Sequence, residues 1–174
     1  MARFLHQEFI PHHPARRYVV LIGFWIAGSM CGIASACHAD ASFLSMMHRT
    51  VYCSASIVRL LVTVFLPFLL SAMAVFLSVP RLLFPIAFVR AYLLTFVSMG
   101  ILLTFGSAGW LFRFLIGFGD IVSVPLLFFF WLRCLREGEK ICHTDFLVVA
   151  SLIFMIVCID FRIISPLLAG FISL

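Results

Sequence analysis

The sequence predicts an all-α protein, a polytopic helical bundle of the integral membrane class. Of its 174 residues, 64% are hydrophobic and 11% are charged, whereas soluble domains are about 45–50% apolar and about 25% charged. The mean hydropathy is +1.21, and 21 phenylalanines accompany a single lysine, Lys140. These values exclude a soluble globular domain and describe a surface that mostly meets lipid.

Five apolar segments are long enough to cross a membrane, since roughly 20 apolar residues span about 30 Å of hydrocarbon. They belong to one transmembrane domain, residues 18–174, and cover about 18–37, 56–79, 82–105, 111–132 and 146–165. The preceding residues 1–17 contain apolar side chains and are broken by Pro11 and Pro14. We expect them to form a short cytoplasmic segment at the membrane interface.

The basic residues predict how the bundle is oriented. Five spans place the N-terminus, the Ser78–Arg81 turn and the loop 133–144 on one side of the membrane. Most basic residues lie in these parts: Arg3, Arg16, Arg17, Arg81, Arg133, Arg136 and Lys140. Lys and Arg in short loops favour the cytoplasm, so we expect the N-terminus inside and the C-terminus outside. The net charge of +5 therefore reflects topology, and no continuous basic stripe indicates nucleic-acid binding.

Small residues line one face of the first span. Gly28 and Gly32 are four residues apart, which is the spacing of a smooth helix face that allows close packing. The partner of this face is another span of the same chain or a second copy in a homo-oligomer. The run Ala34 to Cys37 also resembles a lipoprotein processing site, but the apolar stretch before it is long for a signal peptide.

The sequence gives little sign of catalytic or metal chemistry. Its six cysteines form no C-x-x-C pair, and the ligand types in the external segment 38–55 have irregular spacing. No Ser-His-Asp set, P-loop or dinucleotide fingerprint is present. We therefore expect no enzyme activity, no cofactor and no metal site.

The charges inside the predicted spans are the most informative residues, because an ionisable group at membrane depth costs at least a few kcal/mol. At about 1.5 Å per residue, Arg90 lies about 12 Å into the third span and Asp120 about 13 Å into the fourth, from opposite sides. The short turn between these spans makes them antiparallel neighbours, so we predict an Arg90–Asp120 ion pair. Asp160 and Arg162 reach the outer interface, and Arg59 and Arg113 similarly lie near outer ends and need no special role.

The sequence predicts a helix interruption around Asp120. Gly117, Gly119 and Pro125 fall close together in the fourth predicted span. Such residues permit a kink or an unwound turn, which marks binding sites in many transporters. A structural kink whose backbone groups are satisfied by neighbouring helices is the alternative.

Three runs occur in a characteristic order along residues 18–165. VLIGFWIAGSMCGI is followed by an external segment, then by LPFLLSAMAVFLSVPRLLFPIAFVRAYLLTF, a glycine-containing turn and GFGDIVSVPLLFFFWL. This order resembles the stage II sporulation protein M family of bacterial membrane proteins. Arg90 with the following small and aromatic residues is similar to the family's middle span, and Gly119, Asp120 and Pro125 are similar to its next span. Ala91 and Thr95 stand where the family has glycines, and Gly119 where it has a first proline.

The resemblance implies a non-enzymatic scaffold in the bacterial cytoplasmic membrane that assembles with membrane partners, including cell-wall hydrolases during engulfment in sporulation. A scaffold or permease-like subunit would bind partners through its spans and the 38–55 segment. The alternative is a small-molecule or ion transporter subunit that uses Arg90, Asp120 and the broken fourth span.

Overall fold

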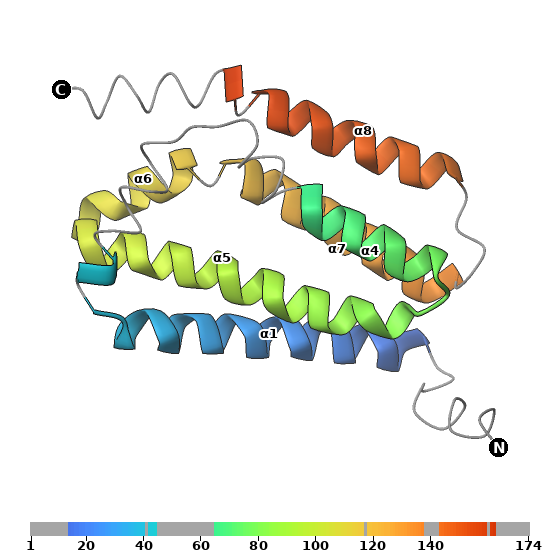
Figure 1. Ribbon diagram of the computed structural model, residues 1–174, viewed down its shortest axis with the longest axis horizontal. Helices are drawn as coiled ribbons and strands as arrows, with labels where there is room; N and C mark the ends of the chain where they lie inside the picture. Colours follow the sequence, from blue (N-terminus) through green and yellow to red (C-terminus); the bar gives the residue numbers. More distant parts are fainter. Residues whose placement is uncertain are drawn as a thin grey trace.

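The computed structural model describes residues 14–40, 42–44, 65–116, 118–137, 143–159 and 161–162. Within these residues all regular structure is helical, which confirms the all-α prediction for this part of the chain (Figure 1). Most of the predicted N-terminal interfacial segment, most of the external segment 38–55, the start of the predicted second span and residues 163–174 lie outside the described residues.

Five helices form the body of the bundle, and three short ones connect them. The longer helices are α1 (Pro14–His38), α4 (Leu66–Phe76), α5 (Leu83–Phe105), α7 (Phe118–Glu137) and α8 (His143–Ile159). The short helices are η3 (Pro80–Leu82), η4 (Gly106–Ala108) and α6 (Gly109–Ile116).

Local sequence signals explain where these helices end. α4 stops before Ser78, whose φ of 56° places it in the left-handed region. Pro80 then starts η3, since proline suits a first helical turn but interrupts a helix interior. α5 ends at Gly106, which adopts a φ of 57° that glycine accommodates without strain.

The five longer helices alternate in direction along the chain (Figure 1). The starts of α1, α5 and α8 share one end of the bundle with the ends of α4 and α7. Side chains join the helices there: Phe24 stacks on Phe84 with ring centroids 5.7 Å apart, and Phe76 contacts Phe146 at 5.8 Å. We call this the basic end, because five arginines lie there: Arg16, Arg17, Arg81, Arg133 and Arg136.

Aromatic side chains fill the core between α1 and the group of α4, α7 and α8. Trp131 of α7 is fully buried, and its indole Nε1 donates to Ser71 Oγ of α4 at 2.7 Å. Trp25 of α1 lies against the rings of Phe128 and Trp131, with centroids 4.8 Å and 6.1 Å apart. Phe68 contacts α8 through a stacked ring pair. The core therefore connects helices far apart in the sequence.

The predicted fourth span, 111–132, is not one continuous helix. Its residues are divided between α6, which ends at Ile116, and α7, which starts at Phe118. α7 also continues to Glu137, so Arg133 and Arg136 belong to its last turns and not to a loop. Hydropathy does not separate two apolar helices that follow each other closely, which explains the error.

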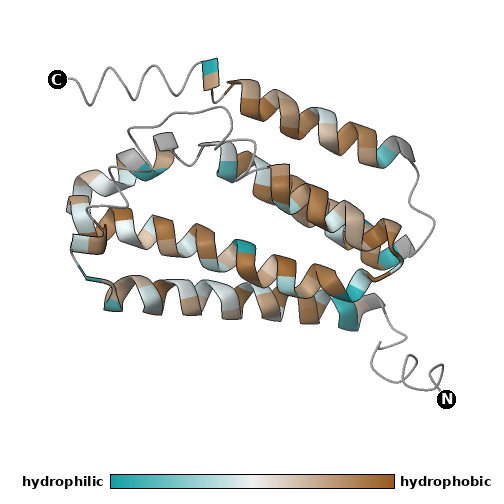
Figure 2. Ribbon diagram, in the orientation of Figure 1, coloured by the Kyte–Doolittle hydropathy of each residue, from teal (hydrophilic) through white to brown (hydrophobic). Residues whose placement is uncertain are grey.

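Among the residues that the structure describes, two helical stretches are long and apolar enough to cross a membrane, Ala15–His38 and Pro80–Leu111. In their most apolar windows only 22% and 28% of the residues are buried. A core helix of a soluble protein would be mostly buried, whereas these helices turn much of their surface outward. Figure 2 shows apolar residues along both helices.

Candidate functional site

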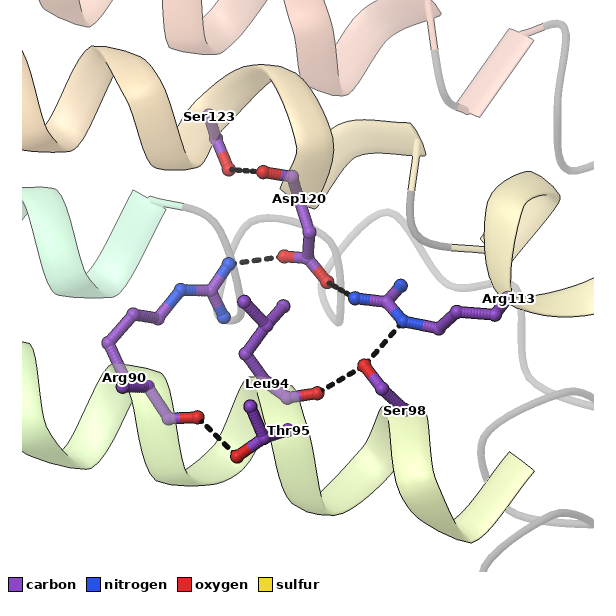
Figure 3. A network of polar contacts seen from close by, with 8 residues as sticks. Arg90, Leu94, Thr95, Ser98, Arg113, Asp120 and Ser123 are labelled. Atoms are coloured by element: carbon purple, nitrogen blue, oxygen red, sulfur yellow. Dashed lines mark hydrogen bonds and ion pairs between the residues drawn. The ribbon is translucent and has the colours of Figure 1, made fainter. Parts of the chain in front are cut away.

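A cluster of charged residues lies inside the bundle, between α5, α6 and α7 (Figure 3). Its centre is Arg90, in the middle of α5 and only 6% exposed. Arg90 donates from Nη2 to Oδ1 of Asp120, which forms an ion pair between α5 and α7. The structure thus brings together the two residues that the sequence predicts to pair.

Asp120 occupies the first turn of α7 and its side chain is 24% exposed. Unpaired backbone N–H groups make a helix start electropositive, so a carboxylate is favourable there. Ser123 Oγ also lies 3.4 Å from the backbone oxygen of Asp120, within the same turn. The helix start and the Arg90 guanidinium thus both place positive charge beside this side chain.

Arg113 of α6 is a third member of the cluster. Its Nη2 lies 3.8 Å from Asp120 Oδ2, and its Nε donates to Ser98 Oγ at 2.5 Å (Figure 3). Ser98 in turn donates to the backbone oxygen of Leu94 at 2.5 Å. The expectation that Arg113 needs no special role is therefore wrong, because the fold turns α6 back against α5 and directs this side chain inward.

The cluster connects three helices through one carboxylate. Asp120 belongs to α7, accepts a hydrogen bond from Arg90 on α5 and faces Arg113 on α6. Arg90 Nε is buried and has no hydrogen-bond partner among the described residues. Breaking a buried ion pair leaves an uncompensated charge and is strongly destabilising. The arrangement can hold helices in register, and it can also present guanidinium groups to an anion.

The glycines of α1 bring this helix against α5. A Cβ at Gly28 would overlap the backbone oxygen of Phe88, and one at Gly32 would overlap Thr95 Oγ1. The Thr95 hydroxyl also lies 3.2 Å from the backbone oxygen of Ser29. The close packing expected for Gly28 and Gly32 thus lies within the chain, and it places the α5 segment that carries Arg90.

The glycines and proline predicted to interrupt the fourth span have different positions. Gly117 lies outside the described residues, between the end of α6 and the start of α7. Gly119 is buried in the first turn of α7. Pro125 lies inside α7, which continues through it, so the chain is helical and not unwound at this proline. The break between helices α6 and α7 thus lies on the N-terminal side of Asp120.

Two further polar contacts join helices at the basic end. Arg17 Nη1 of α1 donates to the backbone oxygen of Leu135 in α7 at 3.1 Å. Arg133 Nε of α7 lies 3.0 Å from Asp145 Oδ2 in the first turn of α8. These contacts fix the ends of α7 and its neighbours relative to each other.

Comparisons with known proteins give no family assignment. No protein-family model matches the chain, and no curated protein or solved structure matches it significantly. The resemblance to the stage II sporulation protein M family therefore stays a prediction.

Proposed function

We propose that this chain is a five-span integral membrane protein that acts as a non-enzymatic scaffold and resembles stage II sporulation protein M. The observation that carries the proposal is an inverted distribution of side chains. Arg90 is 6% exposed, whereas Met30 and Leu147 are 65% and 60% exposed. Membrane proteins turn apolar side chains to lipid and keep ionisable groups within the bundle.

The alternating directions of the five longer helices support five crossings. α1, α5 and α7 contain 25, 23 and 20 residues, and each therefore spans about 30 Å or more at about 1.5 Å per residue. α4 and α8 are shorter and apolar.

Aromatic and basic residues mark the two membrane–water interfaces between which the apolar helix surface would lie. Trp110, at the start of α6, is 69% exposed at the end opposite the basic end. Tyr18 lies beside Arg17 at the basic end. Trp and Tyr favour membrane interfaces, and Lys and Arg favour the cytoplasmic side. The proposal therefore places the basic end in the cytoplasm of a bacterial cell.

The scaffold role is supported by the buried charged residues, which contact one another and so join three helices. Arg90 and Arg113 both engage Asp120, so these groups hold α5, α6 and α7 in register. Membrane partners, cell-wall hydrolases among them, would bind the exposed spans and the 38–55 segment, as the family resemblance implies.

Co-purification in mild detergent after crosslinking in cells tests this role. Mass spectrometry should identify a cell-wall hydrolase with the wild-type chain, and Asp120→Asn should lose folded protein and partner together. Asp40→Asn is the matched control for folding alone, because Asp40 is an exposed carboxylate away from the basic end but belongs to the proposed partner-binding segment 38–55. A bound metabolite without any protein partner would overturn the scaffold proposal.

A second candidate is an anion or small-molecule transporter subunit. The observation that favours it is the approach of two guanidinium groups to Asp120 beside the change of helix from α6 to α7. Helix starts and guanidinium groups both attract anions.

Transport assays in vesicles separate the two functions. A transporter in which Asp120 serves the substrate pathway should stay folded as Asp120→Asn but lose transport, whereas Asp40→Asn should keep both. Loss of folding together with loss of partner recovery favours the scaffold.

A further inference from the structure

The basic end carries an excess of positive charge. Five arginines lie there against Glu137 and Asp145 among the described residues. The exposed charged residues described at the opposite end are Asp40 and Arg162, which have opposite signs. Figure 2 shows hydrophilic residues at the basic end of several helices, directly beside apolar helix surface. The excess is thus confined to one end of an apolar bundle.

Within this end, the contact between α1 and α7 positions guanidinium groups. Arg17 Nη1 donates to the backbone oxygen of Leu135 at 3.1 Å, so its side chain bridges the two helices. Arg136 follows Leu135 directly and is exposed, and Arg16 precedes Arg17 and is also exposed. A guanidinium has five N–H donors, and the carbonyl engages one of those on Arg17. We call this group of three arginines the α1/α7 seam.

Exposed apolar side chains accompany the two exposed arginines on the outer faces of these helices, since Val19 follows Arg16 by three residues and Phe129 precedes Arg136 by seven. Val19 and Ile22 of α1 are 69% and 47% exposed, and Phe129 of α7 is 56% exposed. A ligand that matches this surface has an anionic group at one end and a hydrocarbon chain at the other. Free phosphate and nucleic acid have no part that would use the apolar surface.

We propose that the α1/α7 seam binds the phosphate headgroup of an anionic phospholipid, with the acyl chains along α1 and α7. Guanidinium groups pair with phosphate oxygens in a planar, bidentate geometry. Basic sites between helices at the cytoplasmic side bind such headgroups in membrane proteins. The inference rests on the proposed membrane location, and it adds a ligand and a site to it.

Thermal unfolding of the purified full chain in mild detergent tests the site. Phosphatidylglycerol and phosphatidylcholine with identical acyl chains are added in turn, and inorganic phosphate is added separately. Phosphatidylglycerol should raise the unfolding temperature more than phosphatidylcholine, and inorganic phosphate should not reproduce the increase. Arg16→Gln and Arg136→Gln should each weaken phosphatidylglycerol binding by about fivefold, given about 1 kcal/mol per basic residue near an anionic surface.

Arg162→Gln is the matched control, because Arg162 is an exposed arginine beyond the other end of α8. This variant should keep the wild-type preference for phosphatidylglycerol. Since Arg16 and Arg136 are exposed, their variants should unfold at the wild-type temperature without lipid, which separates lost binding from lost folding.

Three results would overturn the proposal. The two lipids could raise the unfolding temperature equally, or the preference for phosphatidylglycerol could survive both Arg16→Gln and Arg136→Gln. Arg162→Gln could also weaken phosphatidylglycerol binding as much as the seam variants do. Incorporation into vesicles distinguishes this failure from failure of the membrane function. A chain that enters vesicles of both lipids without preference lacks only the lipid site. A chain that enters neither contradicts the membrane location and the lipid site together.

Discussion

One carboxylate organises the interior of this bundle at the level of single residues. Asp120 accepts a hydrogen bond from Arg90, and its Oδ2 lies 3.8 Å from Arg113 Nη2. Arg90 is the more buried of the two arginines, with 7% of its side chain exposed against 15% for Arg113. Because a buried charge without a partner is the most expensive state, Arg90 should depend on Asp120 more strongly than Arg113 does.

A double-mutant cycle tests the Arg90–Asp120 pair. Asp120→Asn should lower the free energy of unfolding by about 3 kcal/mol, because it leaves the buried Arg90 without its partner, and Arg90→Gln should lower it less, because Asp120 keeps the contact with Arg113. The double variant should lose less than the sum, with a coupling of about 1–3 kcal/mol. Chemical or thermal unfolding in detergent measures these values. Strictly additive losses would contradict the pair.

The buried contact between Trp131 and Ser71 gives a second prediction. Ser71→Ala should cost about 1–3 kcal/mol, because the fully buried indole N–H loses its acceptor. Ser151→Ala in α8 is the control, since Ser151 is exposed and the same substitution should cost little. Near-equal unfolding temperatures of the two variants would show that the indole hydrogen bond contributes little to stability.

The parallel pair of α1 and α5 is the closest helix contact at the level of elements. Gly28 lies against the backbone of Phe88, and Gly32 lies against Tyr92 and Thr95. The backbones approach because no Cβ stands between them, which allows close van der Waals packing and the Thr95 contact with Ser29.

Three glycine-to-alanine variants of α1 test this contact. Gly28→Ala and Gly32→Ala should each destabilise the protein by about 1–3 kcal/mol, because the new methyl group overlaps the α5 backbone or the Thr95 hydroxyl. Gly23→Ala should be neutral or stabilising by up to about 1 kcal/mol, since nothing lies within 4 Å of its Cβ position. Unfolding in detergent compares them, and equal effects at the three positions would refute the packing role.

The sequence predicts some of these elements better than others. The predicted segments 18–37 and 82–105 nearly coincide with α1 and α5, because each is a long apolar run bounded by proline, glycine or polar residues. The fourth segment is predicted as one helix because α6 and α7 are both apolar and follow each other with one residue between them. Periodicity and hydropathy carry no signal for a change of helix direction between two such elements.

In the candidate site, too, the sequence predicts some contacts and misses others. Arg90 and Asp120 are charges in apolar runs, so their depth and the antiparallel arrangement suffice to predict their contact. The position of Arg113 depends on how α6 folds back on α5, which brings its Nε to Ser98. An arginine seven residues before Asp120 is a local hint, but only the three-dimensional arrangement makes it a member of the cluster.

At the scale of the whole molecule, the arginines and the directions of the helices agree. All five arginines of the basic end lie where α1, α5 and α8 start and where α4 and α7 end. A bundle with alternating helices and basic residues at one end has a defined orientation in a membrane, because Lys and Arg resist translocation. The same end holds the α1/α7 seam, so orientation and lipid binding would depend on overlapping residues.

Reporter fusions test this orientation. A reporter that is active only in the cytoplasm should work at the N-terminus and after Lys140, and one active only outside should work at the C-terminus. Reversing Arg16, Arg17 and Arg81 to Glu should reduce the correctly oriented fraction, because the positive bias at the cytoplasmic side is lost. Arg162→Glu at the opposite end should leave the orientation unchanged. A cytoplasmic C-terminus together with a cytoplasmic N-terminus would require an even number of crossings and would refute the five-span arrangement.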